Sequence, residues 1–277
     1  MKRIIHLSDL HVGHQDMHER FEHIIKMIKF TKPEAEKYVI VLTGDLVERA
    51  TEKNYEQAKE CIDFLRKERY TVLPIPGNHD YSEGLYHSKR NVKKFKKAFF
   101  EKDDDFFQTD REEYPKIDII GQQGERIAFI GLDSMADELH WYDSLWANGE
   151  IGEKQLKRMD ERLREERVVE CKYKVVYLHH HIFAPLHPTH ELKDTDKFVK
   201  HLKEYMEEDG EKHKINALCF GHNHHGHIWN GQLGIPRCYD GGTSTSKANG
   251  SSPHRVIDLS RDPINDYDGN FLRGYPF

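Results

Sequence analysis

The hydrophobic positions near the N-terminus alternate between short continuous runs and helically spaced stripes. Residues 2–8, 38–42 and 72–75 are short, mostly apolar runs, which is typical of buried strands. Between them, apolar residues recur at intervals of three and four over residues 17–30 and 55–65, which predicts two amphipathic helices. Two strand–helix–strand units of this length imply right-handed crossovers and a parallel sheet covered by helices. The pattern therefore predicts an α/β fold.

The rest of the chain predicts a second sheet. A charged excursion at about residues 81–115 contains a helix-like segment at 89–101. It is followed by short strands at 116–120 and 126–132, whose turn-rich separation suits a hairpin. Two helices are then expected at about 152–167 and 194–208, and strands at 173–178, 217–220, 227–229, 237–240 and 255–259. Because no repeat, linker or low-complexity tract interrupts the pattern, we expect one domain over residues 1–277, with the excursion near the functional site.

The composition is that of a globular protein with a well-solvated surface. Of the 277 residues, 37% are hydrophobic and 32% are charged, which supplies a core and excludes a disordered chain. The apolar stretches are far shorter than the roughly 20 residues that cross a bilayer. The N-terminal residues also lack the apolar segment of a signal peptide. We therefore expect a cytoplasmic protein with no membrane partner.

Charged and metal-binding residue types narrow the chemistry further. The 42 basic and 48 acidic residues give a net charge of −6, which argues against a broad nucleic-acid-binding surface. The four cysteines are widely spaced without a C-x-x-C pair, so we expect buried free thiols rather than disulfides. The 20 histidines are an unusually large number, and several of them follow predicted strands.

Ligand-type side chains follow five of the predicted strands. Because the C-terminal ends of parallel strands meet at one edge of a sheet, we expect these side chains to converge. Carboxylate, imidazole and amide donors suit Mn, Fe or Zn. Two ions roughly 3.5–4 Å apart, sharing a carboxylate, would use seven or eight such ligands and leave room for a hydroxide, which predicts a hydrolase site. The motifs are Asp9-x-His11, Gly44-Asp45, Gly77-Asn78-His79-Asp80, His179-His180-His181 and Gly221-His222-Asn223-His224.

In this order, each after a strand, the five motifs resemble those of the calcineurin-like metallophosphoesterase superfamily. Their joint occurrence over residues 9–224 is far more specific than any one of them. The resemblance implies the metallo-dependent phosphatase-like fold, a four-layer αββα sandwich of two mixed β-sheets flanked by helices. It also implies a dinuclear metal centre. Matched by motif, Asp9, His11 and His224 would hold the first ion, Asn78, His179 and His222 the second, and Asp45 would bridge them.

The resemblance also implies two catalytic residues that do not bind metal. His79 would act near the leaving group as a proton donor or electrostatic stabiliser, and Asp80 would orient its ring. A metal-bound hydroxide would be the nucleophile. The family usually has His-His-Pro where this chain has three histidines, so His180 stays open as an alternative ligand to His179. We favour His179 because it directly follows the predicted strand.

Within the superfamily, the chain is most similar to the class III cyclic nucleotide phosphodiesterases and the glycerophosphodiesterases. The similarity rests on Thr43-Gly44-Asp45-Leu46, on residues 179–194, and on Gly234-Ile235-Pro236 before a Thr/Ser-rich turn at 241–246. It implies a phosphodiesterase that hydrolyses small phosphate esters of these types. Gly44-Asp45-x-x-Glu48-Arg49 is also faintly similar to the protein phosphatases, although Ala50 stands where they have glycine.

Three alternatives to a small-molecule phosphodiesterase are open from sequence. The first is a phosphomonoesterase or protein phosphatase. The second is a DNA nuclease of the same superfamily, against which the acidic net charge argues. The third is a non-catalytic metal-binding scaffold, which would not need His79 and Asp80.

Each candidate residue also has an ordinary interpretation. Asp45 and Asn78, taken singly, could be turn or helix-cap residues, and the motif histidines could be satisfied core residues. Only the joint pattern favours a site. We expect solvated or structural roles for His14, His225, His227, the acidic run at 103–105 and the basic stretch at 89–97.

Overall fold

A computed structural model describes residues 2–14, 24, 28–29, 31–83, 87–100, 114–136, 148–183, 192–244, 255–261 and 265–268. The acidic run at 103–105 lies outside these residues, and so does the predicted helix at 17–30 except for residues 24 and 28–29. Within the described parts of the chain, no helix is long and apolar enough to span a membrane.

The N-terminal half builds the first sheet, whose strand order is β11-β10-β1-β2-β3. The predicted parallel strands are confirmed as β1 (Arg3–Leu7), β2 (Tyr38–Thr43) and β3 (Thr71–Ile75). Two strands from the end of the chain, β10 (Arg255–Asp258) and β11 (Asn265–Asp268), add to it in antiparallel fashion. This sheet is therefore mixed.

The second sheet has the order β4-β5-β6-β7-β9-β8. The predicted hairpin is confirmed, because β4 pairs with β5 in antiparallel register, while β5, β6, β7 and β9 run parallel and β8 is antiparallel to β9. The strands are β4 (Lys116–Ile120), β5 (Ile127–Gly131), β6 (Tyr173–Tyr177), β7 (Ala217–Phe220), β8 (Ile228–Asn230) and β9 (Arg237–Asp240).

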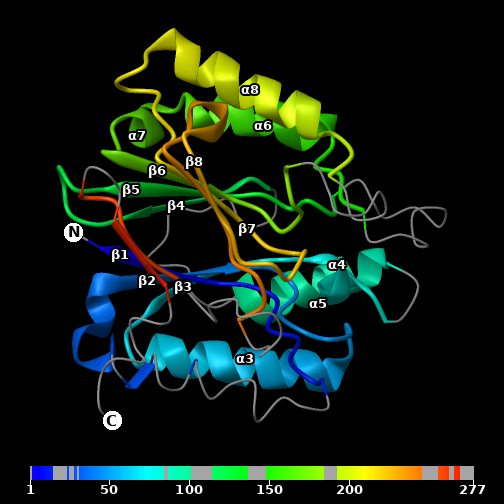
Figure 1. The fold of residues 1–277 in the computed structure, drawn as a ribbon. Coiled ribbons are helices and arrows are strands. Elements are labelled where there is room, and N and C mark those ends of the chain that lie inside the picture. The colour runs from blue at the N-terminus through cyan, green and yellow to red at the C-terminus, as the bar shows by residue number, and fades with distance from the viewer. Residues whose placement is uncertain are drawn as a thin grey trace.

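Helices cover the outer faces of the two sheets, as Figure 1 shows for α3 and α5 on one side and α6 and α8 on the other. Apolar stripes explain this placement: in α3, Tyr55, Ala58, Ile62 and Leu65 are buried at the predicted helical spacing. The expected four-layer α/β sandwich is therefore confirmed. The helical elements are η1 (Lys32–Lys37), α3 (Glu52–Lys67), α4 (Asn78–Tyr81), α5 (Lys89–Phe100), α6 (Glu153–Leu163), α7 (Glu166–Val169), α8 (Thr195–Glu208) and η2 (Gln232–Gly234).

Some local expectations were wrong. The single helix expected at 152–167 is divided into α6 and α7, because Glu165 adopts an extended backbone conformation (φ −60°, ψ 133°) that a helix cannot contain. The short helix α4 and the strand β11 were not expected at all. The four cysteines are free, and three of them are buried as predicted, but Cys61 is exposed.

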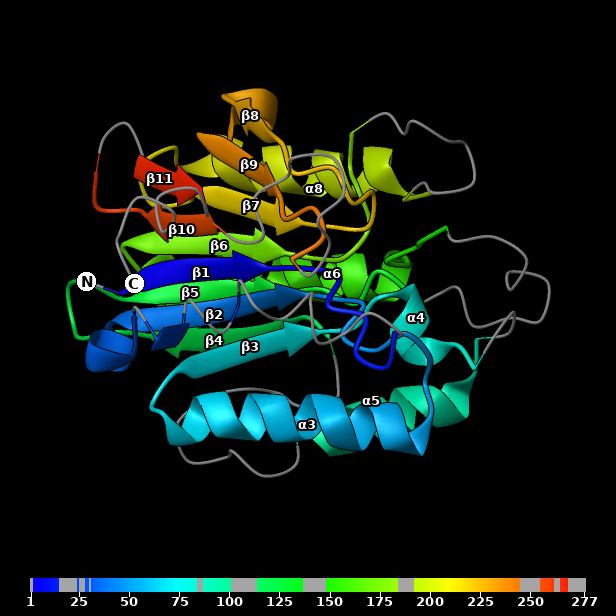
Figure 2. The ribbon, with the colours of Figure 1, turned by 60° about the horizontal axis from the view of Figure 1, so that its bottom comes forward.

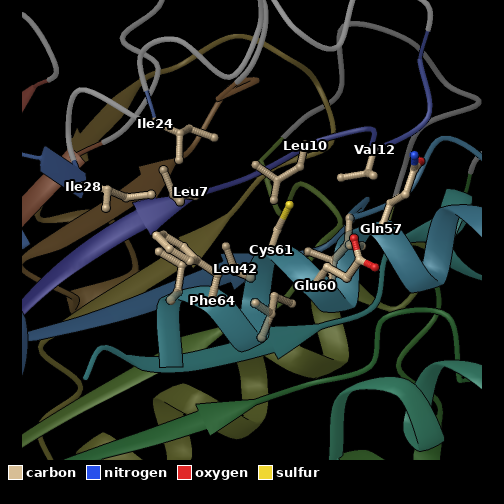
Figure 3. Close-up of a pocket in the computed structure, with 14 residues that line it drawn as sticks. Leu7, Leu10, Val12, Ile24, Ile28, Leu42, Gln57, Glu60, Cys61 and Phe64 are labelled. Atoms are coloured by element: carbon tan, nitrogen blue, oxygen red, sulfur yellow. The ribbon is translucent and has the colours of Figure 1, made fainter. Parts of the chain in front are cut away.

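An apolar cavity of about 400 Å³ lies between β1, β2 and α3 (Figure 3). Its lining includes Leu7, Leu42 and Phe64, and also Ile24 and Ile28 from the predicted stripe at 17–30. Ile24 is buried and Ile28 packs against the core, which agrees with the inward face expected for that stripe. The described lining contains none of the predicted metal ligands.

Candidate metal centre

The predicted ligands lie just beyond the C-terminal ends of the strands. In Figure 2 the arrowheads of β1, β2, β3 and β7 point towards the same edge of the molecule. Asp9 and His11 follow β1, and Asp45 follows β2. Asn78 begins α4 and is separated from the end of β3 by Pro76 and Gly77. The remaining histidines follow β6 and β7 in the other sheet. Both sheets therefore contribute to one site.

Five of the seven predicted ligands have left-handed backbone conformations. Their φ angles are 52° at Asp9, 49° at His11, 49° at Asp45, 77° at His222 and 58° at His224. Residues other than glycine rarely adopt such angles. Each costs of order 1–3 kcal/mol and persists only where the surrounding structure holds it. Such strain concentrates at functional sites, where it directs side chains to a common point.

The first group of donors combines side chains from the ends of β1 and β7. Oδ1 of Asp9 lies 3.1 Å from Nε2 of His224, and this nitrogen lies 3.3 Å from Nε2 of His11. The donor atoms of all three residues lie within 4.8 Å of one another. The other carboxylate oxygen of Asp9 accepts a hydrogen bond from the backbone N–H of His222 at 3.1 Å, which fixes its orientation.

The second group surrounds Nε2 of His179. This nitrogen lies 3.1 Å from Oδ1 of Asn78, 3.1 Å from Nδ1 of His222 and 3.4 Å from Oδ2 of Asp45. On the other side of the ring, Nδ1 lies 2.7 Å from the carbonyl oxygen of Thr43. Since a carbonyl can only accept, Nδ1 carries a proton, and in the neutral ring the lone pair of Nε2 faces the group.

These residues fit a metal ion by their chemistry and their spacing. Oxygen and imidazole nitrogen donors of this kind bind divalent first-row metals. Donor atoms of Asp9, Asp45 and His179 also lie within 4.8 Å of one another, so Asp45 belongs to the same cluster as both groups. The Thr43 carbonyl is the kind of outer partner that orients a metal-binding histidine. The structure thus brings all seven predicted ligands together.

The calcineurin-like phosphoesterase family model matches residues 2–226 of this chain. The chain belongs to the calcineurin-like phosphoesterase family. It is 24% identical, over 229 residues, to a probable glycerophosphodiester phosphodiesterase from Arcobacter nitrofigilis; the match covers 80% of this chain and 71% of that protein. Family membership makes the protein a metal-dependent phosphoester hydrolase with a small phosphate-ester substrate.

Solved structures agree on the fold. The chain is similar to a dimetal phosphatase from Danio rerio, with a TM-score of 0.59, 11% identity, and coverage of 97% of this chain and 96% of that one. It is also similar to GAP50, described as the anchor in the inner membrane complex of Plasmodium, with a TM-score of 0.57, 14% identity, and coverage of 92% and 80%. At these identities the likeness shows a shared architecture.

His79 of this phosphoesterase lies beside the cluster. Its backbone N–H donates to Oδ1 of Asp45 at 2.9 Å, and its ring Nδ1 donates to the carbonyl of Glu48 at 2.9 Å. The ring meets that of His11 edge-on, with centroids 4.7 Å apart. Burial lowers the pKa of His79, but the negative charge of Asp45 and the Glu48 carbonyl outweigh burial and raise the pKa above its usual value.

The predicted contact between Asp80 and the ring of His79 was wrong. The Asp80 carboxylate instead accepts three backbone N–H groups, from Leu46 at 3.2 Å, Val47 at 3.0 Å and Gly77 at 2.8 Å. The Asp80 carboxylate thus faces the N-terminal end of α4, the helix that carries it, and the loop after β2. Asp80 therefore fixes the backbone that carries the ligands, and the ring of His79 is held by Glu48.

Glu48 contacts two histidines of the site, where the sequence predicted no role for it. Besides its carbonyl contact to His79, its carboxylate Oε2 lies 3.0 Å from Nδ1 of His11. The hydrogen bond with His11 lowers the pKa of Glu48 despite partial burial. A carboxylate behind a metal-binding histidine fixes the ring and makes it a better ligand. The sequence feature that could have indicated this role is the position of Glu48, three residues after the predicted ligand Asp45.

At two glycine positions of the motifs there is no room for a side chain. A Cβ at Gly77 would lie 2.3 Å from Oδ1 of Asp45, and one at Gly221 would lie 1.9 Å from Oγ of Ser8 and 2.5 Å from Oδ2 of Asp9. No side chain fits at either position without moving a ligand.

Metal uptake by the phosphoesterase should release protons. Burial lowers the pKa of His179, but the Asp45 and Asp9 carboxylates and the Thr43 carbonyl together raise the pKa to about 10, so the metal-free ring is protonated near neutral pH. Only the unprotonated Nε2 binds a metal ion. The apparent affinity should therefore rise with pH, by about tenfold per unit for each displaced proton. Calorimetric titration with Mn²⁺ in Pipes and in Tris, whose ionisation heats differ, would measure the protons released. Equal heats in the two buffers would contradict this expectation.

Proposed function

We propose that this phosphoesterase hydrolyses small phosphodiesters, of the glycerophosphodiester or cyclic nucleotide type, with two metal ions that share Asp45. The observation that carries the proposal is the placement of the Asp45 carboxylate between the two donor groups. Its Oδ2 lies 3.4 Å from Nε2 of His179 and 4.0 Å from Nε2 of His11. Burial raises the pKa of Asp45, but these histidines and His79 hold it well below its usual range, so the carboxylate is ionised and able to bridge two cations.

The two donor groups divide the ligands between two positions. The first position would be held by Asp9, His11 and His224, and the second by Asn78, His179 and His222. Mn, Fe and Zn all suit these donors. When bound, two such ions neutralise phosphate charge and activate water for in-line displacement at phosphorus.

His79 would assist departure of the leaving group. Its Nδ1–H is committed to the Glu48 carbonyl, so Nε2 is the ring atom that can exchange a proton with substrate. Its raised pKa increases the protonated fraction of the ring, which suits a donor to a leaving oxygen. The name of the Arcobacter relative supports the preference for a diester.

Replacing His79 by Asn should separate chemistry from metal binding. The His79→Asn variant should lose about 10²-fold or more in kcat, the usual contribution of a positioned proton donor, with an unchanged metal content. The matched control is His201→Asn, since His201 lies on α8 with its Nδ1 3.5 Å from Oδ1 of Asp160. Unchanged turnover of the His79 variant would exclude the proposed role.

The substrate class can be tested directly. After chelation, Mn²⁺, Fe²⁺ or Zn²⁺ is added back in turn, and hydrolysis of bis(p-nitrophenyl) phosphate is compared with that of p-nitrophenyl phosphate. Metal-restored cleavage of the diester is the expected result. Cleavage of the monoester alone would contradict the diester preference, and no cleavage with any metal would contradict a hydrolytic function.

A further inference from the structure

A third histidine, His180, lies directly behind the second donor group. It is fully buried, and its ring packs against that of His222 with centroids 4.5 Å apart and edge-on to that of His179 at 5.0 Å. A ring nitrogen of His180 lies within 4.8 Å of donor atoms of both neighbours. From position alone, His180 could be either a ligand or a support for the ligands.

Ser134 decides between these roles by fixing the protonation of the ring. Ser134 is fully buried, and among the described residues both hydrogen bonds of its side chain go to His180. The backbone N–H of His180 donates to Oγ at 3.2 Å, and Oγ lies 2.7 Å from Nδ1. A buried hydroxyl must place its single proton on an acceptor, and within the described parts of the chain that acceptor is Nδ1 of His180.

The ring of His180 therefore carries its proton on Nε2, opposite to the arrangement at His179. At His179 the Thr43 carbonyl requires the proton on Nδ1 and leaves Nε2 for a metal ion. At His180, Nδ1 accepts from the hydroxyl, which places the one proton of the neutral ring on Nε2. The neutral His180 ring therefore has no free lone pair for a metal ion, whereas that of His179 does.

The ring of His180 is also held from its other sides. A Cβ at Gly149 would lie 2.4 Å from Cγ of His180, so the Gly149 backbone lies directly against the ring. The backbone N–H of Glu150 donates to the carbonyl of Ser134 at 2.8 Å, which joins this segment to the loop after β5. His180 is thus fixed between a backbone segment, a hydroxyl and the ring of His222.

The loop that carries Ser134 also contacts α4, the helix that begins at Asn78. Oδ2 of Asp133 accepts a hydrogen bond from the Tyr81 hydroxyl at 2.9 Å, and Tyr81 lies on α4, three residues after Asn78. The buried side chain of Gln155 fixes this loop, bonding both the N–H and the carbonyl of Asp133 at 2.9 and 2.8 Å. One loop therefore supports the elements that carry Asn78 and His222.

We infer that Ser134 and His180 are positioning residues that hold the His222 ring at the second metal position without binding the metal. The left-handed backbone of His222 (φ 77°) makes such support necessary, since the strained conformation must be maintained by its surroundings. This inference rests on the proposed division of the ligands between two positions. It predicts that loss of the Ser134 hydroxyl weakens the second position selectively.

The test is metal titration of Ser134→Ala, His180→Phe and the double variant. Binding of Mn²⁺ is measured by calorimetry, and binding of Co²⁺ is measured from its visible spectrum. Each single variant should weaken binding at the second position by about tenfold to 100-fold and leave the first unchanged, as for other outer partners of metal ligands. The double variant should lose little more than either single variant, because both remove the same hydrogen bond. Thr195→Ala, which removes a hydroxyl bonded to the Leu192 carbonyl at 2.6 Å at the start of α8, should leave both affinities unchanged.

Other outcomes would overturn the inference in distinguishable ways. If His180 is itself a ligand, His180→Phe will weaken the second position far more than Ser134→Ala does. If the wild type binds two ions, and Ser134→Ala and His180→Phe each keep the wild-type affinity at both metal positions, then Ser134 and His180 do not position His222. The proposed function would be unaffected by that result. If the wild type binds a single ion, the two-position proposal fails together with the inference. Circular dichroism of the metal-free variants distinguishes a selective loss of metal from a loss of folding.

Discussion

The Asp45→Asn variant should be nearly inactive, with kcat/KM at least about 10³-fold below that of the wild type. This loss corresponds to about 4 kcal/mol of transition-state stabilisation. In the wild type the backbone N–H of His79 donates to Oδ1 of Asp45 at 2.9 Å. The amide oxygen of the variant can still accept this hydrogen bond, so the loop after β2 should keep its conformation. The amide nitrogen, however, would direct hydrogens rather than a lone pair at the position between His179 and His11. No neutral amide replaces a carboxylate bridging two cations.

The metal content of Asp45→Asn should show whether its loss of activity comes from a loss of bound metal. We expect Asp45→Asn to retain fewer ions per chain than the wild type after gel filtration, measured by atomic emission. Asp63→Asn is the matched control, since Asp63 is a half-exposed carboxylate of α3 paired with Lys59, and it should keep both activity and metal. Wild-type activity in the Asp45 variant would refute a bridging role.

The sequence was sufficient to predict the convergence of the site. Parallel strands end at one edge, so ligand-type residues placed directly after β1, β2 and β3 had to lie close together. The same argument applied to β6 and β7 in the second sheet. We expected the ends of all five strands to converge, but strand order within each sheet does not determine how two sheets face one another. The family resemblance supplied the sandwich in which both sheets contribute to one site.

Side-chain direction was the part that sequence could not supply. Asp80 follows His79 directly, which made a carboxylate–histidine pair plausible, yet consecutive residues of a helical turn point in different directions. Asp80 consequently meets backbone N–H groups, while the carbonyl of Glu48, 31 residues earlier in the chain, reaches the His79 ring. The choice between His179 and His180 also depended on partners distant in sequence, the Thr43 carbonyl and the Ser134 hydroxyl.

Asp80 instead accounts for the rigidity of the loops that carry the ligands. The donors to its carboxylate belong to the two residues after Asp45 and to the residue before Asn78. Burial and the charge of Asp45 raise the pKa of Asp80, and the three N–H donors oppose this rise. One side chain therefore joins the turn after β2 to the start of α4, and so sets the separation of Asp45 and Asn78.

Removal of this carboxylate should be the most destabilising single substitution at the site. In Asp80→Ala the three backbone N–H groups lose their acceptor in a fully buried position, and each unsatisfied group costs about 1–3 kcal/mol. We expect the free energy of unfolding of the metal-free protein to fall by about 3 kcal/mol or more, measured by urea denaturation. Asp80→Asn keeps one acceptor oxygen and should lose less, whereas Asp63→Ala on the surface of α3 should change little. If Asp80→Ala unfolds at the same urea concentration as the wild type, Asp80 does not hold these loops.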